Sequence, residues 1–370
     1  MVNSINTYVP GEPARVAEFF EHLEHDYGGV SVRTMELPGN QTPWHRSGLK
    51  VQQGQAYSLF AEGVIHWSER YPHLCGGPQF HLWARIQSHG STQGRAVNLC
   101  SDTGTFVADV AGDLELGIYM GMWADQFGNL KSGTHLYDAL RGAISVAIVV
   151  YDSDVEKLLE WASGLDSIPP MVMAETQRHL RNDSPPSGWH YLHEAGYSSL
   201  YQKLTTDDGA IIRAQANDDQ GILRHEVDFP LADSTTIQWR WRLDENPSRD
   251  REDRAVSHDY VSVAVEFDDG RDLSWIWSSC LEPESFFQCP VKIWSERETH
   301  FVVRSKDDKL ATWYGETRSV LTDVSKSMGS PPKRITAVWL IVVSTFNHRR
   351  AHASFADIAL TGEGRQLKVL

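Results

Sequence analysis

Two pairs of tryptophans are the residues best suited to hold an organic ligand. Trp239 and Trp241 stand two positions apart, and so do Trp275 and Trp277. Residues i and i+2 of a β-strand share a face, so each pair would contribute to one aromatic wall. Indole faces stack on flat organic molecules and on sugar rings. The pattern therefore predicts a ligand-binding wall, although the same alternation also fills the core of a β-sandwich.

Charged and polar residues flank this wall. Arg240 falls on the opposite strand face and is a candidate clamp for an anion or carbonyl group, and Tyr260 opens the next strand-like run as a candidate binding residue. Asp259 and Asp244 are candidate acid–base residues of such a pocket. The alternative for these charges is a solvated sheet face, on which Arg240 pairs with Glu266 or Asp268.

A histidine-rich region earlier in the chain offers a second set of candidates. His81 and His66 are candidate acid–base residues, because histidine titrates near neutral pH. Trp83 shares a predicted strand face with His81 and is a candidate substrate-binding residue. The alternative for each histidine is a satisfied hydrogen bond in a loop or core.

The sequence predicts no metal site. The histidines lack the close spacing and cysteine partners of zinc ligands, and the cysteines form no CxxC pair. We expect them to be reduced thiols of a cytoplasmic protein. The four cysteines are Cys75, Cys100, Cys280 and Cys289.

Composition and missing motifs exclude several classes of protein. The net charge of −15 and the absence of a basic stripe argue against nucleic-acid binding. No signal peptide and no apolar run of membrane-spanning length is seen, so no membrane contact is expected. The chain has no P-loop, dinucleotide-binding glycine motif, G-x-S-x-G or H-E-x-x-H, so no cofactor is predicted. A homo-oligomer is compatible with the sequence.

Short alternating runs separated by turn residues dominate the chain and predict an all-β protein. A helix is expected within residues 13–26, and helical spacing returns in 154–181, ahead of the proline-rich segment 183–188. We therefore predict two jelly-roll-like β-sandwiches joined by a short helical connector. Their predicted bounds are 1–152 for the N-terminal helix and first sandwich, 153–188 for the connector and 189–364 for the second sandwich.

The first half resembles the small galactose-binding lectin sandwich of the PA-I type. The matching runs are PWHRSGLKV (43–51), GQAYSLFAEG (54–63), LWARI (82–86) and GDLELG (112–117), about a third of the chain. The resemblance implies a β-sandwich and sugar binding. In the place of the lectin's calcium loop, only Asp125, Gln126 and Asn129 offer side-chain oxygens, whereas calcium takes six to eight. The sequence therefore predicts no calcium there.

The second half resembles a bacterial β-sandwich family of unknown function. The matching runs are WRWRL (239–243), DY (259–260), WIW (275–277), VWLIVV (338–343) and ASFADI (353–358), within residues 189–362. The turn STFNHRR (344–350) departs from the acidic turn of that family. The resemblance implies a fold and no chemistry.

Two functions remain open on these observations. The first is a cofactor-independent enzyme, a cyclase or isomerase of secondary metabolism that shapes an apolar metabolite inside an aromatic-lined pocket. The second is a carbohydrate-binding or scaffold protein without catalysis. The sequence predictions favour the enzyme, because no export signal is seen, tryptophan is abundant and the calcium ligands are missing.

Overall fold

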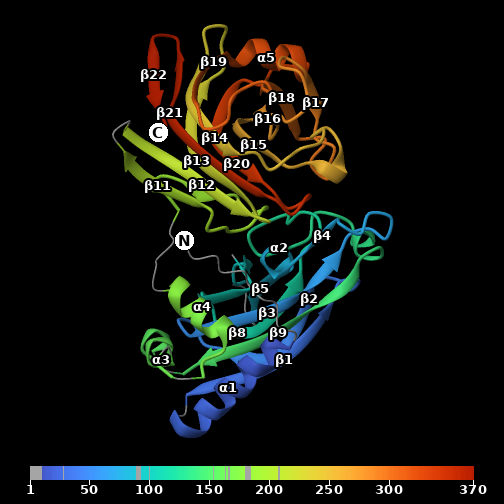
Figure 1. Cartoon of the computed structure of the whole chain (residues 1–370), viewed down its shortest axis with the longest axis vertical. Coiled ribbons are helices and arrows are strands. Elements are labelled where there is room, and N and C mark those ends of the chain that lie inside the picture. The colour runs from blue at the N-terminus through green and yellow to red at the C-terminus, as the bar shows by residue number, and fades with distance from the viewer. Residues whose placement is uncertain are drawn as a thin grey trace. The chain divides into compact units, whose positions relative to one another are not determined.

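The computed structural model describes residues 11–27, 29–88, 93–99, 101–152, 154–162, 164–165, 167–179, 185–206 and 209–370 (Figure 1). The chain divides into two compact units, residues 1–183 and 184–370, and this division falls inside the predicted connector. Each unit is built around two β-sheets. The predicted all-β class with two sandwiches is therefore confirmed.

The first unit contains a five-stranded and a four-stranded sheet. The larger sheet has the order β1-β9-β3-β4, with β7 paired to β3, and the smaller has the order β2-β8-β5-β6. The bounds of the larger sheet are β1 Val30–Pro38, β3 Ala56–His66, β4 Cys75–Gly76, β7 Thr103–Val107 and β9 Arg141–Tyr151. Those of the smaller are β2 Trp44–Val51, β5 Leu82–Gln87, β6 Val97–Asn98 and β8 Gly112–Ile118.

Strand β9 shows why this unit has three layers. Ile144, Val146 and Ile148 are buried in the core between the two sheets, whereas Val149 and Tyr151 are buried in a second core under the helices. A strand covered on both faces reads as a continuous apolar run rather than an alternating one. The run 143–150 is therefore apolar because helices cover the outer face of the sheet.

The helices of the first unit supply that cover. Val16 and Phe20 of α1 are buried against the sheet, together with Leu159 of α3 and Val172 of α4. The helical segment that the sequence predicts as a connector thus packs on the first sheet. The bounds are α1 Glu12–Tyr27, α2 Pro78–His81, α3 Val155–Ala162, α4 Pro170–His179 and the 3₁₀ turn η1 Thr134–Tyr137.

The second unit contains a seven-stranded and a six-stranded sheet. The first has the order β10-β13-β20-β15-β16-β18-β17, and the second the order β11-β12-β21-β14-β19 with β22 paired to β21. The bounds of the seven-stranded sheet are β10 His190–Tyr191, β13 Gln220–Pro230, β15 Tyr260–Phe267, β16 Asp272–Trp277, β17 Phe286–Gln288, β18 Glu298–Arg304 and β20 Arg334–Val343. Those of the six-stranded sheet are β11 Tyr201–Thr206, β12 Gly209–Asn217, β14 Thr236–Glu245, β19 Trp313–Ser319, β21 Arg350–Gly362 and β22 Arg365–Lys368. Helix α5 Val320–Ser327 and the 3₁₀ turn η2 Ala255–Ser257 complete this unit.

Four indoles fill the space between these two sheets. Trp239 of β14 lies 5.5 Å from Trp275 of β16, and Trp241 lies 5.5 Å from Trp277, measured between ring centroids. All four side chains are at most 1% exposed. The face shared by each pair is therefore an interior face of the sandwich.

The seven-stranded sheet is also buried on its outer face, the one turned away from the six-stranded sheet. Tyr260, Ile276, Val302 and Trp339 form a separate cluster there, together with Leu281 from the segment 278–297. A strand buried on both faces can place polar side chains out of water. This outer face carries the buried polar residues described below.

Within the part of the chain that the structure describes, no helix combines the length and apolarity needed to cross a membrane.

Replacing a core indole should destabilise the second unit strongly. We expect Trp275→Ala to lower the free energy of unfolding by about 3 to 5 kcal/mol, because it leaves a large cavity between the sheets. Trp313→Ala is the control: this ring is only half-buried on β19, so its loss should cost about 1 kcal/mol. Denaturant unfolding followed by circular dichroism measures both. Equal small losses would mean that the indoles border open space.

Candidate functional site

The predicted aromatic wall does not face a ligand. The burial and mutual packing of Trp239, Trp241, Trp275 and Trp277 place these rings in the sandwich core. Three of the indole N–H groups donate within the unit, to Glu316, Asp323 and the Ser305 carbonyl. The prediction that these four residues bind substrate is wrong because neighbouring side chains occupy the space beside them.

The charged residues at the margin of that wall are held in local pairs. Arg240 forms an ion pair with Asp357 and lies over the ring of Trp313. Asp244 accepts from Arg242, with 2.7 Å between Nε and Oδ1. Both therefore lie on a sheet surface, but the partner of Arg240 is Asp357 and not Glu266 or Asp268.

Asp259 is buried and organises a turn. Its carboxylate accepts from the backbone N–H groups of Phe346 and Asn347 at 2.9 and 2.8 Å, and from the Asn347 side chain at 2.9 Å. Burial raises the pKa of Asp259 to about 6, although these hydrogen bonds oppose the rise. This carboxylate fixes the turn that departs from the family pattern.

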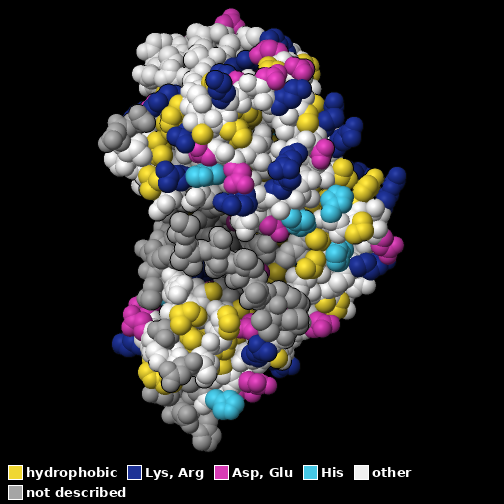
Figure 2. Space-filling view, viewed as in Figure 1, with side chains coloured by type: hydrophobic (Ala, Val, Ile, Leu, Met, Phe, Trp, Pro, Cys, Tyr) yellow, Lys and Arg dark blue, Asp and Glu magenta, His cyan; other side chains and the backbone are white. Residues whose placement is uncertain are grey.

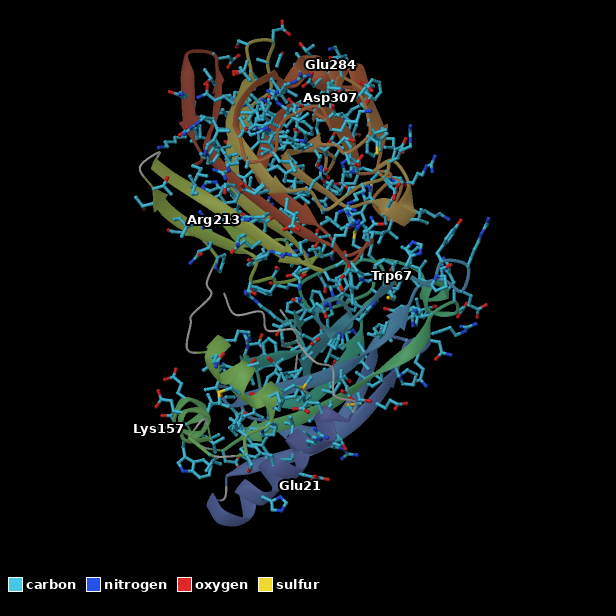
Figure 3. The ribbon with its side chains drawn as sticks, viewed as in Figure 1. Glu21, Trp67, Lys157, Arg213, Glu284 and Asp307 are labelled. Carbon is cyan, nitrogen blue, oxygen red and sulfur yellow. The ribbon has the colours of Figure 1, made fainter. Side chains whose placement is uncertain are left out.

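His81 is buried and neutral, and both of its ring nitrogens form hydrogen bonds. Nδ1 of His81 lies 2.7 Å from the Tyr119 carbonyl oxygen. Because a carbonyl can only accept, Nδ1 carries the proton and donates it. Nε2 then accepts from the Trp67 indole N–H at 2.8 Å. Burial lowers the pKa of His81 to about 4, against the opposing effect of the Tyr119 carbonyl. The imidazole thus fixes Trp67, which is half-buried at the end of β3 (Figure 3).

Trp67 begins a row of aromatic rings at one end of the first sandwich. Successive ring centroids lie 5.3, 5.9, 5.1 and 5.3 Å apart. Of the five rings, those of Tyr119 and Trp123 are buried, and the other three are half-buried. We call these five residues the aromatic row: Trp67, Phe80, Tyr119, Trp123 and Trp44.

The remaining predicted residues of this region lie beside the row. Trp83 is 2% exposed and packs on Tyr119 and Trp123, so it supports the row from the core. His66 is half-buried, and its Nδ1 donates to the Pro72 carbonyl at 3.2 Å. Histidine and hydrophobic side chains lie side by side on the surface of this unit in Figure 2.

The segment at the place of the lectin's calcium loop uses its carboxylate internally. Asp125 accepts from the backbone of Phe127 at 2.9 Å and from the Asn129 side chain at 2.6 Å. These bonds close a turn rather than present oxygens to a cation.

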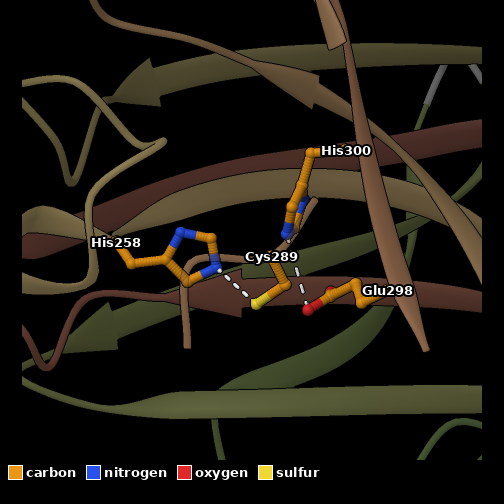
Figure 4. A group of neighbouring side chains, drawn as sticks. All are labelled: His258, Cys289, Glu298 and His300. Atoms are coloured by element: carbon orange, nitrogen blue, oxygen red, sulfur yellow. Dashed lines mark hydrogen bonds and ion pairs between the residues drawn. The ribbon is translucent and has the colours of Figure 1, made fainter. Parts of the chain in front are cut away.

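A second candidate site lies in the second unit, and the sequence did not predict it. His258, Cys289, Glu298 and His300 bring their ligand-type atoms within 4.8 Å of one another, and all four are buried (Figure 4). Nε2 of His258 lies 3.4 Å from Sγ of Cys289, and Nε2 of His300 lies 3.5 Å from a Glu298 oxygen. We call these four residues the outer-face cluster.

Strand geometry assembles the outer-face cluster. Glu298 and His300 stand two positions apart on β18 and so share a face. Cys289 directly follows β17, and its backbone N–H donates to the Glu298 carbonyl at 3.0 Å. His258 precedes β15, two strands away in the sheet. The only short spacing in sequence is the Glu-x-His of β18, which is why a search for close ligand spacing misses the group.

Buried polar groups without hydrogen bonds lie within this cluster and elsewhere on the same sheet. Among the described side chains, both ring nitrogens of His300 and the hydroxyls of Ser262 and Ser274 are buried without a hydrogen bond. Tyr260, a predicted binding residue, is buried and donates its hydroxyl to Glu298 at 2.9 Å. Buried polar atoms normally form hydrogen bonds, so the unbonded ring nitrogens of His300 indicate that something else completes the site.

Burial also governs the protonation of the outer-face cluster. It lowers the pKa of His258 to about 4, with His300 adding to the effect. Burial and then Glu298 raise the pKa of the Cys289 thiol far above its usual value. Of the other cysteines, Cys75 and Cys280 are free thiols, and Cys100 lies outside the described residues.

One protein-family model matches the second half of the chain. Residues 188–359 match the model of a family of proteins of unknown function, DUF3047. No curated protein matches the chain in sequence. The predicted resemblance of the second half to a bacterial sandwich family of unknown function is confirmed.

Solved structures that resemble parts of this chain include three carbohydrate-related proteins. A PllA-like lectin, the EclA N-terminal domain, has 15% identity and a TM-score of 0.23, and covers 32% of this chain and 95% of its own. The xyloglucanase domain of NopAA from Sinorhizobium fredii has 6% identity and a TM-score of 0.28, over 48% of this chain and 94% of its own. A family 30 carbohydrate-binding module from Clostridium thermocellum has 10% identity and a TM-score of 0.27, over 49% of this chain and 95% of its own. The predicted lectin resemblance is confirmed.

The predicted function as a cyclase or isomerase is wrong. Its pocket wall is the packed interior of the second sandwich.

His81 should make stability depend on pH in a defined window. Its folded-state pKa of about 4 lies below the unfolded value of about 6.5, so the unfolded chain binds the extra proton first as pH falls. The contribution of neutral His81 to the free energy of unfolding is therefore complete above pH 6.5 and declines by up to about 3 kcal/mol as the pH falls toward 4.

His81→Gln keeps one donor and one acceptor but does not titrate. Between pH 7 and pH 4, the free energy of unfolding of the variant should therefore fall by about 3 kcal/mol less than that of the natural chain. Denaturant unfolding at a series of pH values measures this difference. If the free energy of unfolding depended on pH equally in the two proteins, His81 would not be a buried neutral histidine.

Proposed function

We propose that this chain binds carbohydrate, and that the half-buried rings of Trp67 and Phe80 form the stacking surface. The observation that carries the proposal is the immobilised indole of Trp67, which is partly exposed while its N–H is held by buried His81. Aromatic rings that present a face to solvent stack on the C–H faces of sugars.

The two rings form one continuous surface. Their centroids lie 5.3 Å apart with 39° between the planes. Phe80 in turn packs edge-on against His81 at 4.6 Å and against Tyr119 at 5.9 Å. A platform supported from below by buried rings loses little side-chain entropy when a ligand binds.

The backbone also approaches His81 closely. A Cβ atom added at Gly76 would lie 2.9 Å from Nε2 of His81, the atom that accepts from Trp67. A larger residue would therefore displace the imidazole and release the indole. Glycine at this position keeps β4 and the platform together.

Polar groups adjoin the platform and could hydrogen-bond sugar hydroxyls. The loop after β3 continues from Trp67 through Ser68 and Glu69 to Tyr71 and His73. Glu69 is exposed and pairs with Arg141 at 3.0 Å. An aromatic face with an adjacent charged and hydroxyl-bearing rim suits a polar ring better than an apolar metabolite.

Glycan binding by the full chain tests the proposal. On a glycan array the labelled protein should bind a defined set of oligosaccharides, and calorimetry with one of these should show at least about tenfold weaker binding for Trp67→Ala, because a central aromatic contact is lost.

Tyr197→Ala is the matched control, since Tyr197 is a 50% exposed aromatic residue of the second unit. Its affinity should equal that of the natural chain. Failure to bind any glycan, or equal affinity for Trp67→Ala and Tyr197→Ala, would refute sugar binding at this platform.

A further inference from the structure

We propose that the outer-face cluster binds one zinc ion in a closed, structural site. His258, Cys289, Glu298 and His300 supply two imidazole nitrogens, a thiolate and a carboxylate oxygen. The inference concerns the second unit and does not depend on carbohydrate binding by the first.

The ligand atom of His258 is oriented by a bond on the other side of its ring. Nδ1–H donates to the Glu252 carbonyl at 2.6 Å, so Nε2 carries the lone pair and points toward Sγ of Cys289. Histidines that bind metals almost always donate their other ring nitrogen to a carbonyl or carboxylate in this way.

His300 provides the strongest indication that an ion completes the site. Its side chain is fully buried among the rings of Tyr260, His258 and Phe287, with centroids 4.8 to 5.0 Å away. Neither ring nitrogen has a hydrogen bond in the described structure. Nδ1 has no partner, and Nε2 only faces a Glu298 oxygen at 3.5 Å without a hydrogen bond. Burial of such nitrogens is costly, and coordination of a cation by Nε2 would lower that cost at the atom nearest Glu298.

The charges of the cluster balance a divalent ion. Two neutral imidazoles, one thiolate and one carboxylate carry a total charge of −2, so a divalent cation gives a neutral buried group. The nearby guanidinium of Arg297 is already paired with Glu194, Glu266 and Asp272. A metal ion therefore supplies the positive charge that a thiolate needs in this buried place.

Ligand types and spacing favour zinc. Tetrahedral zinc with bonds of 2.0 to 2.3 Å places its ligand atoms about 3.3 to 3.7 Å apart. The His258–Cys289 distance of 3.4 Å and the His300–Glu298 distance of 3.5 Å fit this range. All four ligand atoms lie within 4.8 Å of one another, so a small inward movement of the side chains would complete the coordination shell. Calcium and magnesium prefer oxygen ligands, which argues against them here.

Four buried protein ligands leave no open coordination position, as in structural zinc sites. The ion would join Cys289, in the segment 278–297 that packs Leu281 on the outer face, to β18 and to His258, which stands two residues before β15. It would therefore fasten that covering segment over the outer face of the seven-stranded sheet.

Metal analysis of the full chain tests this site. Protein produced with added zinc and then gel-filtered should contain about one zinc per chain. Replacement by Co²⁺ should give a thiolate-to-cobalt charge-transfer band, and removal of metal by a chelator should lower Tm by about 5 to 10 °C.

Cys289→Ser should lose the charge-transfer band and retain at least about tenfold less zinc. Cys280→Ser is the matched control, because Cys280 is a free thiol of the same unit outside the cluster, and it should keep both properties. His300→Gln should also lose zinc. If Cys289→Ser fails to fold, the cobalt spectrum of the natural chain still decides. Zinc-free natural protein without a cobalt–thiolate band, or equal zinc in the two cysteine variants, would overturn the proposal.

Discussion

Packing of four indoles between β14 and β16 is the constraint on which the second unit depends. Trp239 and Trp241 meet Trp275 and Trp277 at 5.5 Å across the sandwich, so this face of both sheets is closed to ligands. Strand alternation then turns the intervening residues outward. Ser274 thus lies on the same outer face as His300, its partner in the β16–β18 pairing. The polar residues of this unit gather on the outer face because the inner one is filled with indole.

Two buried histidines show how burial alone fails to define a site. His81 has both ring nitrogens satisfied, one by the Tyr119 carbonyl and one by the Trp67 indole, so it needs no further partner. His300 is equally buried, but its Nδ1 has no partner and its Nε2 faces a Glu298 oxygen at 3.5 Å without a hydrogen bond. The first is therefore a support for a surface ring, and the second is a candidate ligand. The two units use the same residue type for different physical purposes.

The sequence could predict elements and faces but not what those faces meet. Period-two alternation correctly paired Trp275 with Trp277, yet it could not show whether a cavity or another sheet lay opposite. His81 was selected for its chemistry, although its surroundings hold it neutral. Cys289 and His258 are brought together from 31 positions apart by strand pairing. Only Glu298 and His300 were close enough in sequence to be found, and no pattern links them to the other two.

The central claim is that the exposed end of the aromatic row binds the ligand, whereas the core indoles do not. Indole ¹H–¹⁵N spectra of the full chain during titration with an oligosaccharide would test this most directly. The Trp67 resonance can be assigned with Trp67→Phe. The account predicts a saturable shift of that resonance, with those of Trp239, Trp241, Trp275 and Trp277 unchanged. A shift confined to the core indoles, or no shift of Trp67 at saturation, would contradict it.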